Sequence, residues 1–343
     1  MRIFSAALVA ASAVLSLPTK AQDLSGTLHK IRETKTIALG VQETSIPFSY
    51  LDGNQQAVGY SVDLCLGIAD AIKKKLGLAD LAIQRVPVTS ATRIPLVANG
   101  TVDLQCGSTT NNSERRKQVA FSFPFYFAAV KIMVPKASGI KSFQDLKGKS
   151  VVTTSGGTTI HVMKSLSDKH NLDFRLPSSK DHAEGFLMME TGRADAVSND
   201  DVLLYGLRAN AKAPDDFFVL PDPLSSEPYG LMVRRDDTAF KDAVNSALAA
   251  MFKSGEAASL YKKWFEQPIP PKGLNLQLPL SAQLQTTFAQ PQEIEAFTIA
   301  KIPYRMCGRM PPRLAQVGPG LEIRHSSHHD SGRSDGRWSK TRA

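Results

Sequence analysis

The stretch LQCGSTTNNSER, residues 104–115, passes from a short apolar run into small and polar side chains and ends on Arg115. The apolar part predicts a buried strand that ends at Gly107. In an open α/β sheet, ligands bind beyond the carboxyl ends of the strands. The Ser108 and Thr110 hydroxyls and the Arg115 guanidinium, with its paired donors in a fixed fork, suit a carboxylate. A capped helix with Arg115 in solvent explains the same residues equally well.

Strands and helices alternate on both sides of this stretch. We expect strands over residues 36–41, 82–86, 127–134, 150–153, 194–198, 217–219 and 229–233, and helices over residues 62–76, 91–99, 142–146, 158–170, 183–191, 200–211, 238–252 and 256–265. Such alternation with short connections favours largely parallel sheets with helices on both faces. The predicted fold class is therefore α/β.

Polar residues follow two further predicted strands. In residues 153–159 (TTSGGTT), glycines at the start of a helix allow its backbone N–H groups to approach an anion. A phosphate loop would require Gly-Lys-Ser/Thr, so a small carboxylate fits this stretch better than ATP. The acids in residues 198–201 (SNDD) are able to hold an ammonium group or to cap a helix.

Enzymatic motifs are weak. The sequence contains no HExxH, GxSxG or CxxC pattern, and a Ser-His-Asp triad cannot be claimed without geometry. His161 and His182 could act as bases, but a hydrogen-bonding or surface histidine is the more common case. We therefore expect neither a catalytic residue, nor a metal site, nor a cofactor.

Length and charge limit the class of protein. The 343 residues allow about two domains of ~100–200 residues each. Of the net charge of +9, residues 292–343 carry +4, and residues 23–291 carry only +3. Nucleic-acid binding needs a clustered basic face, so we expect no nucleic-acid partner.

The two ends of the chain differ from its middle in composition. Residues 1–21 combine Arg2, an apolar run and small residues at the cleavage positions, which predicts a cleavable secretory signal; a buried N-terminal helix is the alternative. No Cys follows the run, so we expect a periplasmic protein without a lipid anchor. Beyond this run no stretch approaches the ~20 apolar residues of a membrane span. Residues 292–343 lack an apolar period and are expected to be a disordered tail, although a miscalled C-terminus would look the same.

Six segments resemble the family 3 periplasmic solute-binding proteins of ABC transporters, and among them the glutamate/aspartate-binding group. They are residues 45–50 (SIPFSY), 59–64 (GYSVDL), 106–115, 154–159, 180–182 (KDH) and 260–265 (LYKKWF). The resemblance covers about residues 24–291, and the run GSTTNNxER is specific to the branch that binds acidic and amide amino acids.

The resemblance implies a two-lobed type II binding fold with the ligand cleft between the lobes. Lobe I is expected to be residues 23–128 plus 229–291, and lobe II residues 129–228. Crossover strands near residues 126–130 and 227–230 would join them and form a hinge.

The resemblance also implies which residues hold the ligand's common part. Arg115, Thr110 and Ser108 match the group that binds the α-carboxylate, joined by Thr158 from lobe II. Asp200 matches the acid that binds the α-ammonium.

Ser90, Arg93 and His182 match positions at the side-chain end of the ligand. Gln42 stands where the glutamate/aspartate-binding proteins carry an arginine, and losing that fixed charge makes glutamine or asparagine credible ligands too. A neutral His182 would let the pocket accept an amide, whereas a protonated one would favour an acid. Acidic preference is therefore expected to rise as pH falls through the ordinary imidazole range.

The implied function is capture of an amino acid by cleft closure and its delivery to the membrane permease subunits of an ABC importer, which has a separate ATPase. We expect a monomer. Alternatives are a periplasmic enzyme of the same fold, similar to cyclohexadienyl dehydratase, a sensor domain, or an adhesin.

Cys65 and Cys106 fall in the same implied lobe, one on its first helix and one at a strand end. An oxidising compartment favours a disulfide between them and leaves Cys307 over. Two buried thiols are the alternative.

Overall fold

The computed structural model describes residues 25–294, all of which belong to one compact unit, Met1–Ile302. The predicted signal peptide lies outside the described residues. So does the predicted tail, except for residues 292–294, where Glu293 pairs with Lys241 (2.5 Å between Oε1 and Nζ).

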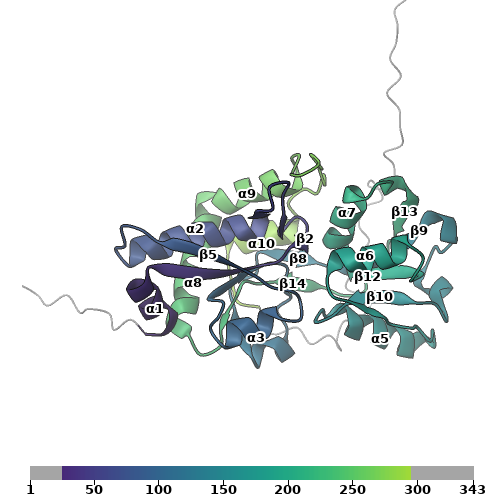
Figure 1. Ribbon diagram of the computed structural model, residues 1–343, viewed down its shortest axis with the longest axis horizontal. Helices are drawn as coiled ribbons and strands as arrows, with labels where there is room; N and C mark the ends of the chain where they lie inside the picture. The colour runs from purple at the N-terminus through teal and green to yellow at the C-terminus, as the bar shows by residue number, and fades with distance from the viewer. Residues whose placement is uncertain (1–24, 295–343) are drawn as a thin grey trace, which may run out of the picture. The chain divides into compact units, whose positions relative to one another are not determined.

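Two five-stranded sheets organise the described chain (Figure 1). The first has the order β5 (Ala82–Pro87), β1 (Thr36–Val41), β6 (Leu104–Cys106), β15 (Met232–Arg234), β7 (Val119–Phe121). The second has the order β11 (Ser178–Ser179), β10 (Val151–Thr154), β12 (Ala196–Asp200), β9 (Val130–Pro135), β13 (Phe217–Val219). We call the first sheet with the helices packed on it lobe I, and the second sheet with its helices lobe II. Their exact boundaries stay those predicted from the sequence.

The prediction of largely parallel sheets is wrong for half of the strand pairings in the two five-stranded sheets. Strands β5, β1 and β6 are parallel, as are β11, β10 and β12, but β15, β7, β9 and β13 pair antiparallel to their neighbours. The reason is where the chain changes lobe. Strand β9 enters lobe II at the sheet edge where β12 ends, since Val130 pairs with Asp200, and must therefore run in the opposite direction.

Strands β8 (Tyr126–Ala128) and β14 (Glu227–Tyr229) lie at the two expected crossovers. They form a separate antiparallel ladder in which Tyr126 is opposite Tyr229. Each is followed within a few residues by a strand of a five-stranded sheet, β9 after β8 and β15 after β14.

Helices complete each lobe. Lobe I carries α1 (Gly26–Thr34), α2 (Tyr60–Lys75), α3 (Arg93–Ala98), α4 (Ser113–Arg116), α8 (Thr238–Ser254), α9 (Glu256–Phe265), α10 (Ala282–Ala289) and the small sheet β2 (Thr44–Ser45), β3 (Ser49–Leu51), β4 (Ala57–Val58). Lobe II carries α5 (Thr159–His170), α6 (His182–Glu190), α7 (Asp201–Asn210) and 3-10 turns at Lys136–Ser138, Phe143–Leu146 and Pro214–Asp216. Helix α10 was not expected in a proline-rich stretch; the Ser281 side chain caps it by accepting from the Leu284 N–H (3.2 Å).

Both faces of the lobe II sheet are buried. On β10, Val151 belongs to the cluster that includes Met163 of α5, while the next residue, Val152, belongs to the cluster with Phe186 of α6. Burial on both faces explains why β10 and β12 each begin with two consecutive apolar residues, Val151-Val152 and Ala196-Val197, rather than alternating. On β10 and β12 the polar residues follow at the carboxyl ends of the strands.

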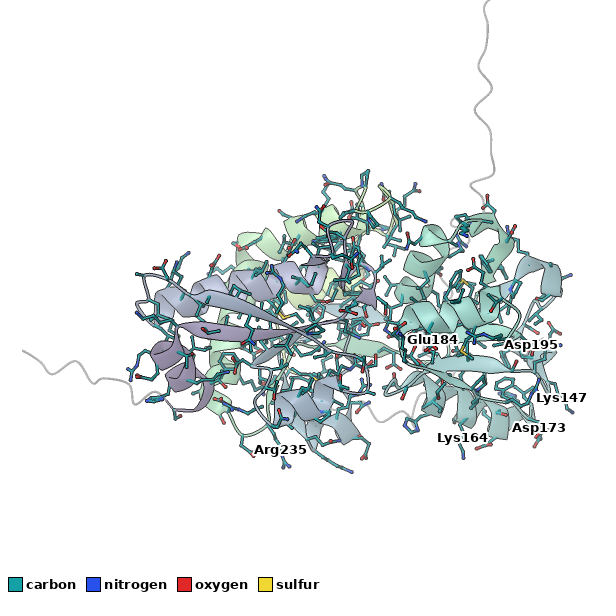
Figure 2. The ribbon with its side chains drawn as sticks, viewed as in Figure 1. Lys147, Lys164, Asp173, Glu184, Asp195 and Arg235 are labelled. Atoms are coloured by element: carbon teal, nitrogen blue, oxygen red, sulfur yellow. A yellow bond between two sulfur atoms is a disulfide. The ribbon has the colours of Figure 1, made fainter. Side chains whose placement is uncertain are left out.

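Many charged side chains of the described residues lie at the surface. Lys147, Lys164, Asp173 and Arg235, labelled in Figure 2, are exposed to solvent. Within residues 25–294, no helix is both long enough and apolar enough to cross a membrane.

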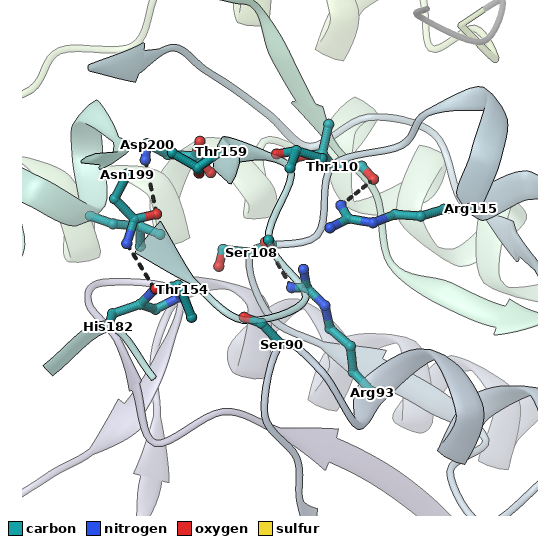
Figure 3. Close-up of a pocket in the computed structure, with 13 residues that line it drawn as sticks. Ser90, Arg93, Ser108, Thr110, Arg115, Thr154, Thr159, His182, Asn199 and Asp200 are labelled. Carbon is teal, nitrogen blue, oxygen red and sulfur yellow. Dashed lines mark hydrogen bonds between the residues drawn. The ribbon is translucent and has the colours of Figure 1, made fainter. Parts of the chain in front are cut away.

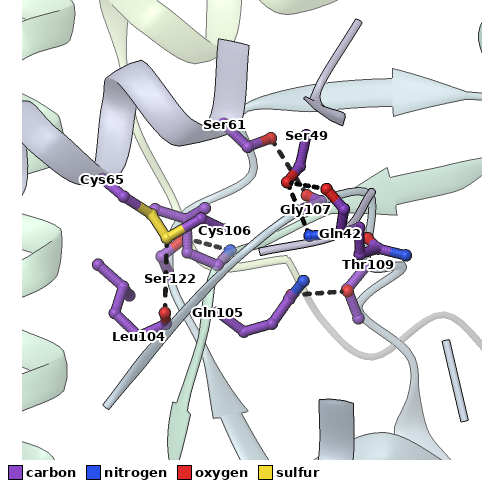
Figure 4. The surroundings of a disulfide bond; sticks show 11 residues. Gln42, Ser49, Ser61, Cys65, Leu104, Gln105, Cys106, Gly107, Thr109 and Ser122 are labelled. Carbon is purple, nitrogen blue, oxygen red and sulfur yellow. Dashed lines mark hydrogen bonds between the residues drawn. A yellow bond between two sulfur atoms is a disulfide. The ribbon is translucent and has the colours of Figure 1, made fainter. Parts of the chain in front are cut away.

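A disulfide joins Cys65 of α2 to Cys106 at the end of β6, with 6.1 Å between the Cα atoms (Figure 4). Both residues are fully buried in the lobe I core. The bridge fastens the helix to the strand that leads directly into residues 107–115.

Replacing both cysteines, Cys65→Ala and Cys106→Ala, should lower the free energy of unfolding by roughly 2–4 kcal/mol, because the bridge closes a loop of 41 residues in the unfolded chain. Urea unfolding followed by fluorescence measures this, with Cys307→Ser in both proteins to prevent exchange. Thiol titration of the unreduced, unfolded wild type with that substitution should find no free thiol, and two free thiols would contradict the bridge.

Candidate functional site

A pocket lies where the ends of β6, β10 and β12 and the start of α6 face each other (Figure 3). Its lobe I wall consists of Ser90, Arg93, Ser108, Thr110 and Arg115. Its lobe II wall consists of Thr154, Gly157, Thr158, Thr159, His182, Asn199, Asp200 and Leu203. The structure thus brings together eight of the nine residues proposed from the sequence, all except Gln42.

Arg115 is positioned by a capped helix and is nevertheless buried. Asn112 caps α4 by accepting from the Arg115 backbone N–H (2.9 Å). The guanidinium is not in solvent: its Nη1 donates to the Thr110 carbonyl (2.9 Å) and its Nη2 to the Gly156 carbonyl of lobe II (3.0 Å). It forms no ion pair among residues 25–294, so its remaining N–H groups are able to hold a carboxylate.

Gly156 allows the two lobes to meet beside Arg115. Its φ is +76°, and a Cβ there would lie 2.5 Å from the Ser90 carbonyl oxygen. Only glycine meets both requirements without strain. Nearby, the Thr158 hydroxyl donates to Glu227 (3.0 Å), a buried acid on the β14 crossover strand.

Asp200 presents one carboxylate oxygen without a partner. Tyr229 donates its hydroxyl to Oδ2, whereas Oδ1 is buried and has no hydrogen bond among the described residues. Burial, and then the charge of Glu227, raise the pKa of Asp200 to about 7. A ligand ammonium group would supply the missing donor and favour the charged carboxylate.

Arg93 and His182 form the opposite end of the pocket. Arg93 is 3% exposed; its Nη1 donates to the Ser108 carbonyl (3.1 Å), while Nε is buried without a partner among the described residues. Burial, and then the charge of Arg93, lower the pKa of His182 to about 3. The expectation that His182 titrates in the ordinary imidazole range is therefore wrong, because desolvation beside a guanidinium disfavours the imidazolium. The other candidate base, His161, is exposed on α5.

Gln42 lies behind the pocket wall rather than on it. Its side chain is buried, its Oε1 accepts from the Ser108 backbone N–H (3.1 Å) and its Nε2 donates to the Ser90 hydroxyl (3.4 Å). It packs so closely on Gly107 that a Cβ there would lie 2.1 Å from Oε1 (Figure 4). Gln42 thus orients two wall residues.

Replacing Gln42 by the similarly shaped Met should weaken ligand binding about five- to tenfold, because the Ser108 N–H would be left buried without an acceptor at a cost of about 1–3 kcal/mol shared between folding and binding. Calorimetric titration measures the affinity. Gln84→Met, at an exposed position of β5, is the matched control and should leave affinity unchanged. Equal affinity in the two variants would remove Gln42 from the site.

Residues that the sequence did not single out complete the wall. Thr154 and Asn199 lie within the strand-end stretches that the sequence did identify, so the rule that ligands lie beyond strand ends could have found them. Leu203 of α7 carried no signal. Glu227 and Tyr229 act from the crossover strand, which only the folded chain brings to the pocket.

The charges on the wall do not cancel. Two guanidinium groups, Arg93 and Arg115, face one carboxylate, Asp200, while His182 is neutral. The buried Glu227 lies behind Thr158 and its charge acts on Arg115 and Asp200, so it does not pair Arg93 at the other end. Buried charges require partners, so the lining groups favour a ligand with one cationic group and two anionic groups. No cluster of three His, Cys, Asp or Glu side chains able to hold a metal occurs in residues 25–294.

Comparison with known proteins gives a consistent result. The family of bacterial extracellular solute-binding proteins, family 3, matches residues 37–267. The L-glutamate/L-aspartate-binding protein of Pseudomonas aeruginosa is 50% identical over 292 residues, covering 85% of this chain and 96% of that protein. The glutamate/aspartate import solute-binding protein of Escherichia coli is 44% identical, covering 78% and 88%. An ancestral arginine-binding protein bound to arginine is similar in structure, with a TM-score of 0.60 and 32% identity, covering 67% and 98%.

Proposed function

Because the chain belongs to the bacterial extracellular solute-binding proteins of family 3, we propose that it captures glutamate or aspartate and delivers it to an ABC importer. The curated relatives at 44–50% identity are named for binding and import of these two amino acids, not for catalysis. They support a binding protein over the enzymatic alternative.

The observation that carries the proposal is the set of charged side chains in the pocket that have no ion-pair partner within residues 25–294. Arg93, Arg115 and Asp200 are each at most 6% exposed and have no ion-pair partner among the described residues. These three line the pocket and sum to one positive charge, while the buried Glu227 lies behind Thr158, where its charge acts on Arg115 and Asp200. Arg93, at the other end of the pocket, is therefore the guanidinium that the second carboxylate of an acidic amino acid would pair. A neutral amino acid would leave one guanidinium buried and unpaired.

The ligand's orientation follows from where these charges lie. Arg115, with Ser108, Thr110 and Thr158 around it, receives the α-carboxylate, and the free Oδ1 of Asp200 receives the α-ammonium.

Arg93, His182 and Ser90 receive the side-chain carboxylate. Gln42 supports Ser90 and Ser108 from behind.

Binding and transport would be coupled by the crossover strands. The ligand touches both lobes, so it stabilises the closed arrangement in which Arg115 reaches the Gly156 carbonyl. The closed protein, a monomer, would then dock on the permease subunits of the importer. Residues 1–21 would direct the chain to the periplasm and be removed there.

Calorimetric titration of protein freed of ligand by unfolding and refolding tests the proposal. Glutamate and aspartate should bind at least about tenfold more tightly than glutamine and asparagine, since an amide NH₂ would face donors. Tighter binding of an amide or a cationic amino acid would contradict it. Turnover of prephenate or arogenate would favour the enzymatic alternative.

A further inference from the structure

Asn199 and His182 form a hydrogen-bonded chain in the lobe II wall (Figure 3). The Asp200 backbone N–H lies 3.0 Å from Asn199 Oδ1, and Asn199 Nδ2 lies 2.8 Å from His182 Nδ1. The Asn199 side chain is buried, and the other ring nitrogen of His182, Nε2, is buried without a partner among residues 25–294.

The chemistry of this chain fixes the direction of the Asn199 amide. A backbone N–H can only donate, so the amide atom facing Asp200 N must be the oxygen. The NH₂ group then faces His182 Nδ1 as a donor, and Nδ1 must accept with its lone pair. A neutral imidazole whose Nδ1 accepts carries its proton on Nε2.

The Thr154 hydroxyl, 3.0 Å from the same Nδ1, does not decide the tautomer. A hydroxyl is able to donate to a bare nitrogen or to accept from a protonated one. Asn199 is therefore the group that sets which ring nitrogen of His182 is protonated.

We propose that Asn199 is a specificity-determining positioning residue, which holds His182 in the tautomer with a proton on Nε2 and thereby makes both nitrogen-bearing side chains at this end of the pocket, Arg93 and His182, hydrogen-bond donors. This inference rests on the proposed function. Together with Arg93, the Nε2–H offers partners to both oxygens of a carboxylate, whereas a carboxamide would direct its NH₂ at a donor.

The inference reverses the expectation that a neutral His182 accepts amides. A neutral imidazole admits an amide only when a bare nitrogen faces the ligand, and Asn199 occupies that bare nitrogen. Acid selectivity then requires no imidazolium, which agrees with the pKa of His182 lowered to about 3 by burial and by Arg93.

The tautomer is measurable without ligand, because Asn199, His182 and Thr154 all belong to lobe II. Long-range ¹H–¹⁵N NMR of ¹⁵N-histidine-labelled protein separates protonated from bare ring nitrogens, with His182→Gln for assignment. At neutral pH we expect the proton on Nε2. In Asn199→Leu we expect a mixture or protonation of Nδ1, whereas Thr154→Val, which touches the same nitrogen, should keep the proton on Nε2.

Affinity provides the second readout. Asn199→Leu should lower the ratio of glutamate to glutamine affinity by about tenfold, since Nε2 becomes able to accept from the amide. A proton on Nδ1 in the wild type, or an unchanged ratio in Asn199→Leu, would overturn the inference; if this variant does not fold, the wild-type spectrum decides. A wild type that binds neither acid contradicts the proposed function, whereas the wrong tautomer in a protein that binds glutamate contradicts only the role of Asn199.

Discussion

Arg115→Ala should weaken glutamate or aspartate binding by roughly 30- to 5,000-fold, equivalent to about 2–5 kcal/mol, because the ligand's α-carboxylate would be buried without its partner. The variant also removes the donors to the Thr110 and Gly156 carbonyls, the second of which joins the lobes. Closure and carboxylate binding therefore fail together.

The neighbouring Arg116 provides a matched control. It is half-buried, lies outside the pocket, and its guanidinium donates to Asn111 Oδ1 (2.6 Å) and to the Ile294 carbonyl. Arg116→Ala should bind ligand within about twofold of the wild type. Calorimetric titration gives the affinities and thermal unfolding of the ligand-free proteins shows whether both fold. Near-normal binding by folded Arg115→Ala would refute the carboxylate assignment.

The sequence predicts elements well where local patterns decide them. Helix α9 and strand β13 have the expected bounds, because a helical apolar period and a short aromatic run are local signals. Strand direction is not local. That β9 and β15 run antiparallel to their neighbours follows from where the chain changes lobe, and nothing in their apolar runs records it.

The candidate site also has some residues that local sequence identifies and some properties that only the folded pocket determines. Arg115 and Asp200 were identified because polar residues at strand ends have a known place in α/β sheets. Gln42 was expected at the ligand but lies behind Ser90 and Ser108, 48 and 66 residues away along the chain. The pKa of His182 depends on burial and on Arg93 of the other lobe, and its tautomer on Asn199. Such properties belong to the assembled pocket.

Affinity of the wild type should fall as pH drops below about 7. Asp200, with its pKa raised to about 7 by burial and by Glu227, is charged above that pH and binds the ammonium directly. Below it the free protein carries a proton on Asp200 that the ligand must displace, so affinity declines by up to about tenfold per pH unit. His182, with a pKa of about 3, adds nothing to this range.

Asp200→Asn should remove this pH dependence and weaken binding at pH 8 by roughly 30-fold or more, since an amide cannot neutralise the buried ammonium. Tyr229→Phe should move the fall in affinity to higher pH. The Tyr229 hydroxyl stabilises the charged carboxylate, so its loss raises the pKa of Asp200. Titration calorimetry from about pH 5 to about pH 9, in buffers of different ionisation enthalpy, also counts the protons released. A wild-type affinity that is level across pH 6–8, or proton uptake on binding, would show that Asp200 is already charged in the free protein and that its carboxylate does not control the ammonium end of the site.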